Sequence, residues 1–448
     1  MKIDVEQARK RAKELVKGGG AGKLADAQLQ VARELGYASW PAMLHAIQPP
    51  TAERVIREAD GRPDRAVELL EAAPQLRADP WVALTLGDAS GIRDARSPGG
   101  PLGLPPLFYV ARSRLAADNL PAVRDLLARG ADPNGPGGEE WTNLSIACAR
   151  GDAALARLLL DAGADPNDND SLYHSVEPRD DACLRLLLER GAKVPGTNAL
   201  WHALDYDRFE RVRILLEHGG GPNESRDWPA LHHAVIRGRS QEFLRLLVEH
   251  GADPALRDQS GRSAFQHALR RGRDDLAETL LELGAPADAD DADRALNAIS
   301  TGARAQPIEL DADARDVLIE LAMRDTGGLA RVIDAVGPDF SARWGGGPRG
   351  TLLHQAAWFG RPGHVDLLLR RGAKPDERVE VEYATPLGWA AVGSRYSPEH
   401  PNDSFSAVDA DWVGVANLLI AAGARVEPRF AEMALPPLSD WLAATASA

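Results

Sequence analysis

Pro229-Ala-Leu-His-His-Ala-Val-Ile-Arg-Gly238, followed by Leu-Arg-Leu-Leu-Val-Glu-His-Gly-Ala-Asp at residues 244–253, decides the fold. The stretch forms a template: an apolar residue, a histidine, small residues and a glycine, then an apolar run that ends in leucines and Gly-Ala-Asp. From Gly130 to Gly284 the glycines of successive endings are separated by 33, 28, 28, 32 and 33 residues, so the chain is built from repeats. The ending of the template returns at Gly130, Gly163, Gly191, Gly219, Gly284, Gly372 and Gly423.

Each repeat contains two short amphipathic segments whose apolar faces cannot be buried within one unit. Stacking of neighbouring units buries these faces, and the glycine after the leucines suits a left-handed residue at a helix end. A period near 33 residues with a Thr-Pro-Leu-His-like head resembles the ankyrin-repeat family, over about residues 104–427. The resemblance implies an all-α solenoid of helix-turn-helix units with β-turn loops and a helical N-terminal cap.

The rest of the chain sets the expected domain organisation. Residues 1–50 form a helical segment similar to those found ahead of many bacterial ankyrin arrays, and residues 51–103 are predicted to be degenerate, capping ankyrin-like helices. The array occupies 104–427, and a C-terminal cap occupies 428–448. The intervals of 88 and 51 residues after Gly284 indicate insertions near 301–316 and 394–411, and such insertions map to loops, often on the binding face.

Composition excludes several classes of protein. A net charge of −14 over 448 residues argues against a nucleic-acid or acidic-membrane partner, since both require a basic face. No apolar run approaches the ~18 residues of a membrane span, and the N-terminus lacks the apolar core of a signal peptide. We therefore predict a cytoplasmic monomer, and the Ala-, Arg- and Gly-rich usage is typical of a high-GC bacterium.

The first helix of each repeat is expected to have two faces. Leu200 and Leu204 share the apolar face, whereas His202, Asp205 and Tyr206 share the other. The ankyrin resemblance implies that this second face lines a concave groove, which would bind a protein or a small anionic or aromatic ligand through arginine donors and flat aromatic rings. The predicted binding residues are Trp201, Tyr206, Arg237, His267, Arg270, Arg271, Trp358, Phe359 and Trp389.

The histidines fall into two sets. His174, His232 and His354 are assigned to the Thr-Pro-Leu-His position, where the resemblance implies a structural role. The second set comes one residue later in three successive units. Neighbouring helices pack about 8–10 Å apart, so these three cannot all bind one metal ion, although two adjacent ones could. The chain contains neither His-Glu-x-x-His nor Cys-x-x-Cys, and we predict no metal and no cofactor. The second set is His202, His233 and His267.

The alternative hypothesis is that the same groove is the active site of an enzyme. His202 with Asp205, or His233 near Tyr206, could transfer a proton in an isomerase, cyclase or hydrolase of a small metabolite. Nothing in the sequence fixes a nucleophile, a cofactor site or an oxyanion hole. The sequence therefore favours a binding protein over an enzyme and does not name its partner.

Overall fold

The structure is a computed structural model that forms two compact units, and each is described by itself. One unit is residues 49–261, and the other combines residues 1–48 with 262–448. Within the described part of the chain, the only strands are β1 (Ser341–Ala342) and β2 (Gly350–Thr351), which pair antiparallel, and the fold is all-α. None of the described helices combines the length and apolarity that a membrane crossing requires. The described residues are 5–18, 24–35, 40, 43, 49–135, 141–168, 170–225, 228–303, 311–342, 349–381, 383–396, 410–427, 429–434 and 437–445.

The first part of the 49–261 unit consists of short helices with clear start signals. The Thr51 side chain accepts the Arg54 N–H at the start of the first helix, and Asp79 caps another in the same way. Pro63 opens a helix in its first turn, where the missing N–H costs nothing. These elements are α4 (Ala52–Gly61), α5 (Pro63–Ala72), the 3-10 helix η1 (Pro74–Ala78) and α6 (Pro80–Thr85).

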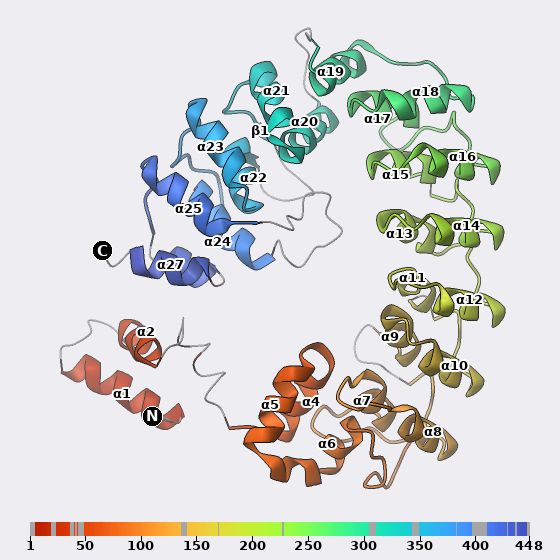
Figure 1. Cartoon of the computed structure of the whole chain (residues 1–448), viewed down its shortest axis with the longest axis vertical. Coiled ribbons are helices and arrows are strands. Elements are labelled where there is room, and N and C mark those ends of the chain that lie inside the picture. Colours follow the sequence, from red (N-terminus) through yellow and green to blue (C-terminus); the bar gives the residue numbers. More distant parts are fainter. Residues whose placement is uncertain are drawn as a thin grey trace. The chain divides into compact units, whose positions relative to one another are not determined.

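From residue 106 the same unit is a stack of helix pairs (Figure 1). The first helices of the pairs are α7 (Pro106–Arg112), α9 (Asn143–Arg150), α11 (Ser171–His174), α13 (Ala199–Asp205) and α15 (Ala230–Ile236). The second helices are α8 (Leu120–Ala128), α10 (Ala153–Asp161), α12 (Ala182–Glu189), α14 (Phe209–Glu217) and α16 (Gln241–Glu249). Each first helix packs against the first helix of the next pair, so the apolar faces are buried between repeats.

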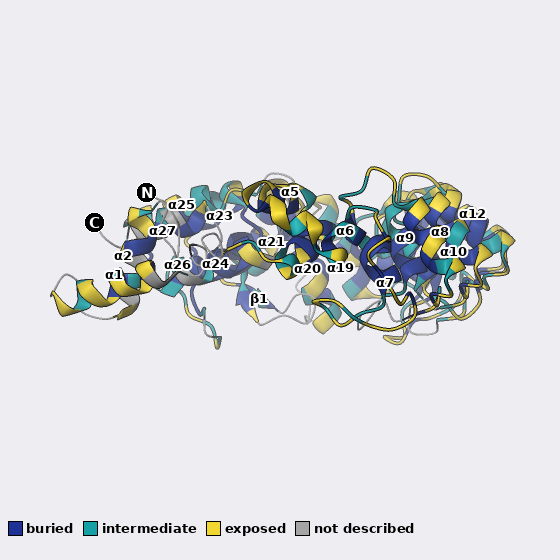
Figure 2. Ribbon diagram, turned by 90° about the horizontal axis from the view of Figure 1, so that it is seen from below, coloured by how far each residue is buried: buried dark blue, intermediate teal, exposed yellow. Residues whose placement is uncertain are grey.

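The helical periodicity explains which side of each helix is buried. In α10, Leu155 and Leu159 are fully buried, whereas Arg157 between them is exposed. Figure 2 shows the same alternation of buried and exposed positions along α8 and α10. Gly163 follows α10 with φ of 96°, a left-handed conformation that glycine adopts without strain.

Asparagines in the turns tie each repeat to the next. Asn134 donates through Nδ2 to the Gly163 carbonyl at 3.1 Å, and its Oδ1 accepts the Asp165 N–H at 2.7 Å. Asn167 and Asn223 form equivalent pairs of bonds with the repeats that follow them. Because these bonds satisfy backbone groups at the end of each helix pair, they hold neighbouring repeats in register.

The second unit contains two separate apolar clusters. Helices α1 (Val5–Lys17) and α2 (Leu24–Glu34) pack on each other through small apolar residues such as Ala8 and Ala27. Another cluster extends from Leu296 to Leu442 across the later helices. The helices of this unit after residue 262 are α17 (Ala264–Arg270), α18 (Asp274–Glu282), α19 (Asp291–Thr301), α20 (Ala312–Arg324), α21 (Thr326–Val336), α22 (Leu352–Trp358), α23 (Pro362–Arg370), α24 (Pro386–Tyr396), α25 (Trp412–Ala421), α26 (Arg429–Met433) and α27 (Leu438–Thr445), and the cluster begins at α19.

The interval that follows Gly284 is largely helical. Asp290 caps α19 through a capping box, and Asp293 in its first turn is fully buried. Of the predicted insertion near 301–316, residues 304–310 lie outside the described residues, and α20 begins at Ala312. The predicted insertion at 394–411 also lies mainly outside them, since residues 397–409 are not described.

Candidate functional site

The helix starts fix which histidines share a position in the repeat. His174, His202 and His233 are each the fourth residue of their helices α11, α13 and α15. The prediction that placed His174 on the Thr-Pro-Leu-His position was therefore wrong by one residue, because α11 begins at Ser171 and its third residue is Tyr173.

His354 occupies the Thr-Pro-Leu-His position as predicted. It is the third residue of α22. Its Nδ1 accepts the Thr351 N–H at 3.3 Å, and its Nε2 donates to the Ala384 carbonyl at 3.1 Å. The imidazole thus closes its own helix start and bonds the backbone of the next repeat, which is the predicted structural role.

Glu177 joins the rings of two successive repeats. The proline at position 178 disfavours a helical conformation at Glu177, and α11 is only four residues long. Oε1 of Glu177 lies 2.6 Å from Nδ1 of His174 and 3.0 Å from Nε2 of His202. The side chains of His174, Glu177 and His202 are 13%, 22% and 7% exposed. One carboxylate oxygen is thus shared by two largely buried imidazoles.

Asp205 extends this network to the following repeat. Its Oδ1 lies 2.8 Å from Nε2 of His233 and 2.7 Å from Nε of Arg237. Its Oδ2 lies 3.8 Å from Nδ1 of His202, a distance of charge attraction but too long for a hydrogen bond. Tyr206 contacts His202 edge-on at 4.9 Å between ring centroids. We call His174, Glu177, His202, Asp205, His233 and Arg237 the His–carboxylate cluster.

The charges of this cluster support one another. Burial opposes ionisation of Glu177, but hydrogen bonds from His174 and His202 lower its pKa to about 2. Burial likewise raises the pKa of Asp205, yet His202 and His233 bring that pKa well below its ordinary value. Burial disfavours the charged form of His202, whereas Asp205 and Glu177 raise its pKa above the ordinary value. The cluster therefore combines ionised carboxylates with an imidazole that favours its charged form.

Aromatic rings surround the cluster on the first helices and the turns before them. The Trp141 ring centroid lies 4.1 Å from that of His174, and Tyr173 stacks on His202 at 3.7 Å with 11° between the planes. Nε1 of Trp201 donates to the Trp228 carbonyl at 2.7 Å. Trp228 is 42% exposed, and the other three aromatic residues are half-buried. We call Trp141, Tyr173, Trp201 and Trp228 the aromatic strip.

A pocket opens beside the aromatic strip. Its volume is about 470 Å³, and both Tyr173 and His174 contribute to its wall. It connects one edge of the His–carboxylate cluster to the surface of the repeat. Its lining residues are Asp170, Tyr173, His174, Gly196, Thr197 and Asn198.

The predicted binding residues of the 49–261 unit come together. Trp201, Tyr206 and Arg237 lie on or directly after α13 and α15. Arg237 pairs with Asp205, Tyr206 contacts His202, and Trp201 bonds the Trp228 carbonyl. The expected proximity of His202 and Asp205 is present, and His233 also reaches Asp205.

The aromatic residues predicted near the C-terminal end of the groove are packed inside. Phe359 and Trp389 are only 3% and 2% exposed, and half-buried Trp358 lies 5.8 Å from Trp389 between ring centroids. The interpretation of Phe359 and Trp389 as accessible anchors was wrong. The Tyr383 ring lies 5.9 Å from the Trp389 ring, and a Cβ at Gly350 would be 2.9 Å from it, so this face is covered.

The predicted basic residues of α17 are also buried, at 1% exposure for His267, 0% for Arg270 and 8% for Arg271. Arg270 pairs with Asp293 at 2.5 Å and with Asp313 at 2.7 Å. Arg271 pairs with Glu320 at 3.1 Å, and one of its Nη atoms lies 3.3 Å from Nδ1 of His267. The arginines that were predicted to bind an anionic ligand thus form ion pairs with carboxylates of the same chain. These ion pairs link α17 to α19 and α20.

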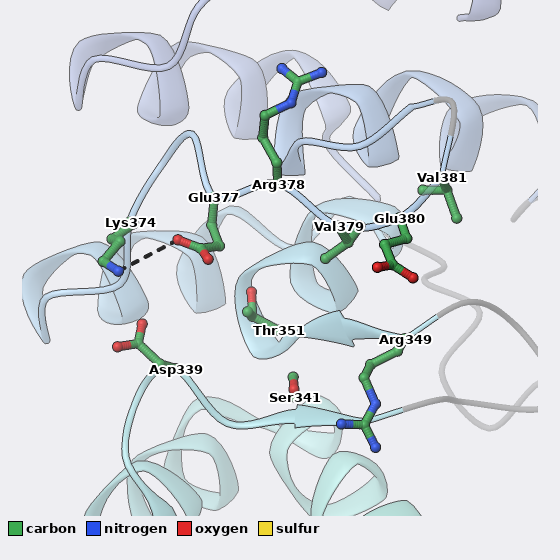
Figure 3. Close-up of a pocket in the computed structure, with 10 residues that line it drawn as sticks. All are labelled: Asp339, Ser341, Arg349, Thr351, Lys374, Glu377, Arg378, Val379, Glu380 and Val381. Carbon is green, nitrogen blue, oxygen red and sulfur yellow. Dashed lines mark ion pairs between the residues drawn. The ribbon is translucent and has the colours of Figure 1, made fainter.

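Another pocket, of about 520 Å³, lies beside β1 and β2 (Figure 3). Cations and carboxylates alternate around it, with Lys374 paired to Glu377 at 3.6 Å and Arg378 paired to Glu427 at 3.0 Å. Figure 3 shows Arg378 extending away from Thr351. Because Lys374 and Arg378 are already paired with carboxylates of the same chain, we take the His–carboxylate cluster and the aromatic strip as the candidate site.

Sequence reasoning missed Glu177 and the role of His174. The signal was available in an ungapped alignment: Ser171-Leu-Tyr-His-Ser-Val-Glu-Pro178 matches Ala199-Leu-Trp-His-Ala-Leu-Asp-Tyr206. Both segments have an aromatic residue, a histidine and then a carboxylate three residues after the histidine. This alignment places His174 with His202 and Glu177 with Asp205, as the structure does.

Comparison with known proteins bears on both fold and function. Residues 107–226, 179–258 and 200–293 match the family model for ankyrin repeats (3 copies). Protein phosphatase 1 regulatory subunit 27 of Homo sapiens and of Mus musculus is 44% identical over 66 residues, which are 14% of this chain and 42% of each relative. The chain thus spans less than half the length of these curated relatives.

Solved structures of ankyrin-repeat domains are also similar to parts of the chain. The domain of Bcl-3 is 29% identical with a TM-score of 0.36, covering 43% of this chain and 89% of that domain. A domain from Acinetobacter baumannii AYE is 30% identical with a TM-score of 0.36, covering 40% and 98%. The family match over residues 107–293 and the stacked helix pairs show that the chain contains an ankyrin-repeat domain with an all-α fold.

Proposed function

We propose that this protein is a binding protein that holds a polypeptide partner along the aromatic strip. The carrying observation is that four successive repeats each place an aromatic residue that is at least partly exposed on the first helix or the turn before it, at positions 141, 173, 201 and 228. A ligand that contacts all four must extend across several repeats, as an extended polypeptide segment can. Tyrosine and tryptophan suit such a surface because they offer large apolar area with a polar tip.

The carboxylates beside the aromatic strip are already paired within the protein. Glu177 and Asp205 are already paired with histidines and with Arg237, so the partner does not have to neutralise them. The chain as a whole carries a net charge of −14. We therefore propose a partner segment that is apolar or aromatic where it meets the strip and basic around it, and whose association slows as salt is added.

The comparisons support a protein partner without identifying one. Part of the chain is similar to a protein named as a regulatory subunit of protein phosphatase 1, and this chain contains ankyrin repeats. This similarity covers 14% of the chain, so the partner of that relative is not carried over. Cytoplasmic location, a monomeric state and a bacterial source stay predictions from the sequence, and the curated relatives quoted above are mammalian.

The test uses selection of binding peptides from a random display library on the immobilised full-length protein. The affinity of an enriched peptide should fall at least roughly tenfold in Trp201→Ala and in Trp141→Ala, as expected for aromatic residues that carry binding energy. Phe209→Ala is the matched control, because Phe209 is 39% exposed but lies on α14 rather than on the strip. Peptides that bind both tryptophan variants as tightly as the unmodified protein would contradict the proposal.

The carboxylates of the cluster do not favour the alternative of acid–base catalysis by His202, Asp205, Tyr206 and His233. A general base works best with a pKa near the operating pH. The pKa values of Glu177 and Asp205 lie far below that range, since both are held by hydrogen bonds from histidines. These residues are therefore better suited to fixing the rings of the site than to exchanging protons with a substrate.

A further inference from the structure

We propose that His174, Glu177 and His202 form a binding site for a divalent transition metal ion, with Zn²⁺ as the preferred ion. The proposal is independent of the polypeptide partner, since it rests on the side chains of two successive repeats. The sequence prediction of no metal considered the set His202, His233 and His267, whereas the structure brings His202 together with His174 and Glu177 instead.

The donor atoms are close to the geometry that zinc requires. One ring nitrogen each of His174 and His202 and a carboxylate oxygen of Glu177 lie within 4.8 Å of one another. In a tetrahedral site with bonds near 2.0–2.1 Å, the donor atoms are separated by about 3.3 Å. The two distances from Glu177, 2.6 Å and 3.0 Å, need only small side-chain movements to reach that value.

The ligands are held in place by their surroundings. Tyr173 stacks on His202, and Trp141 lies against His174, so neither ring turns freely. The other nitrogen of His202, Nδ1, is buried, forms no hydrogen bond and lies 3.8 Å from Oδ2 of Asp205. A carboxylate behind the distal nitrogen of a metal-bound histidine is the usual supporting contact, since it fixes the tautomer and raises ligand basicity.

The site is accessible from one side. His174 forms part of the wall of the pocket of about 470 Å³, which supplies an entry path for the ion. Three protein ligands leave a fourth position for water or for a donor atom of a bound molecule. Two imidazoles and one carboxylate favour zinc and its neighbours in the transition series over Mg²⁺, which prefers oxygen ligands.

The experiment is equilibrium dialysis of the untagged full-length protein against ZnCl₂ at pH 7.5, with bound metal measured by mass spectrometry. The expected result is one zinc ion per chain, with no stoichiometric binding of Mg²⁺. Stoichiometric zinc binding should be lost in His174→Ala and in Glu177→Gln. His250→Ala should bind as the unmodified protein does, because His250 bonds the Leu246 carbonyl of its own helix and lies away from the site.

A second measurement separates ligand loss from misfolding. Glu177→Gln keeps the size of the side chain, and its fold is checked by circular dichroism before dialysis. Co²⁺ added to the unmodified protein should give the visible absorption of a tetrahedral site, and this absorption should be absent in folded Glu177→Gln. No stoichiometric zinc in the unmodified protein, or full binding retained in both ligand variants, would overturn the proposal.

Discussion

Two clusters of histidine and aromatic rings, one around His354 and the other around His202, use the same residue types to opposite effect. Around His354, Trp389 is 2% exposed, and burial lowers the pKa of His354 to about 4. Around His202, two carboxylates outweigh burial and raise the pKa. The first cluster is closed and neutral, whereas the second is half-open and charged.

The difference between the two clusters begins with a shift of one residue in the position of the histidine along its helix. A histidine at the third helical position, such as His354, turns to its own helix start and to the backbone of the next repeat. At the fourth position, His202 meets Glu177 of the preceding repeat at 3.0 Å, and the ring of His174 meets the Trp141 ring of the preceding repeat at 4.1 Å between centroids. The contacts of His354 thus differ from those of His174 and His202 by register and not by residue type.

The largest effect on stability is expected when the tryptophan of the closed cluster around His354 is removed. Trp389→Ala should lower the free energy of unfolding by about 3–5 kcal/mol, because truncation of a buried tryptophan leaves a cavity. Urea unfolding followed by circular dichroism measures the change, and Trp389→Phe should recover part of it. A loss below about 1 kcal/mol would place Trp389 among ordinary surface residues.

A pH dependence follows from the neutral state of His354. Its folded pKa of about 4 lies below the ordinary value of 6.5, so the unfolded chain takes up this proton first as the pH falls. The stability is fully present above pH 6.5 and declines between 6.5 and about 4. At about 1.4 kcal/mol per pKa unit, the decline is about 3 kcal/mol.

Another repeat of the same chain shows which residue can replace His354 and keep its two hydrogen bonds. At the third position of α17, Oε1 of Gln266 accepts the Ser263 N–H at 3.1 Å, and its Nε2 donates to the Asp288 carbonyl at 3.3 Å. His354→Gln should therefore fold and lose this part of the pH dependence. Unfolding free energies of the two proteins at several pH values give the difference, and parallel curves would show that His354 does not carry it.

A smaller effect is expected in the half-open cluster. Glu177→Gln should destabilise metal-free protein by about 1 kcal/mol, because hydrogen bonds to charged groups contribute more than this but partial exposure screens them. The matched control is Glu189→Gln, since Glu189 is exposed on α12 of the same repeat. Equal unfolding curves for the two variants would show that the charge of Glu177 does not stabilise the fold.

The smallest effect on stability is expected at the outer edge of the aromatic strip. Trp228→Ala should change the unfolding free energy by no more than about 0.5 kcal/mol, as for other surface substitutions. The same variant should weaken binding of the selected peptides. A large loss of stability would mean that Trp228 supports the fold instead of presenting a binding surface.

Much of the fold could be predicted from the sequence. The leucines before Gly163 and Gly251 and the spacing of the glycines indicate helix pairs, and both glycines have the expected left-handed conformation. The burial of Asp293 and Arg270 could not be predicted in this way, because it depends on a pairing between helices that are 23 residues apart. Periodicity shows which face is apolar but not which polar residues neutralise one another.

The candidate site could be predicted only in part. His202, Asp205 and Arg237 were identified from helical spacing, which is a local property. Trp389 was misjudged because its cover comes from Tyr383 and from the strand at Gly350, outside its own helix. His174 was misjudged because the unusual start of α11 shifts the register by one residue, and only comparison with α13 reveals the shift.

The most direct test of the contrast between the open and closed clusters is hydroxyl-radical footprinting of the native protein, read out by mass spectrometry at its ten tryptophans. The structure predicts rapid oxidation of Trp228, intermediate rates at Trp141 and Trp201, and protection of Trp389. Oxidation of Trp389 at the rate of Trp228 in the folded protein would contradict the contrast.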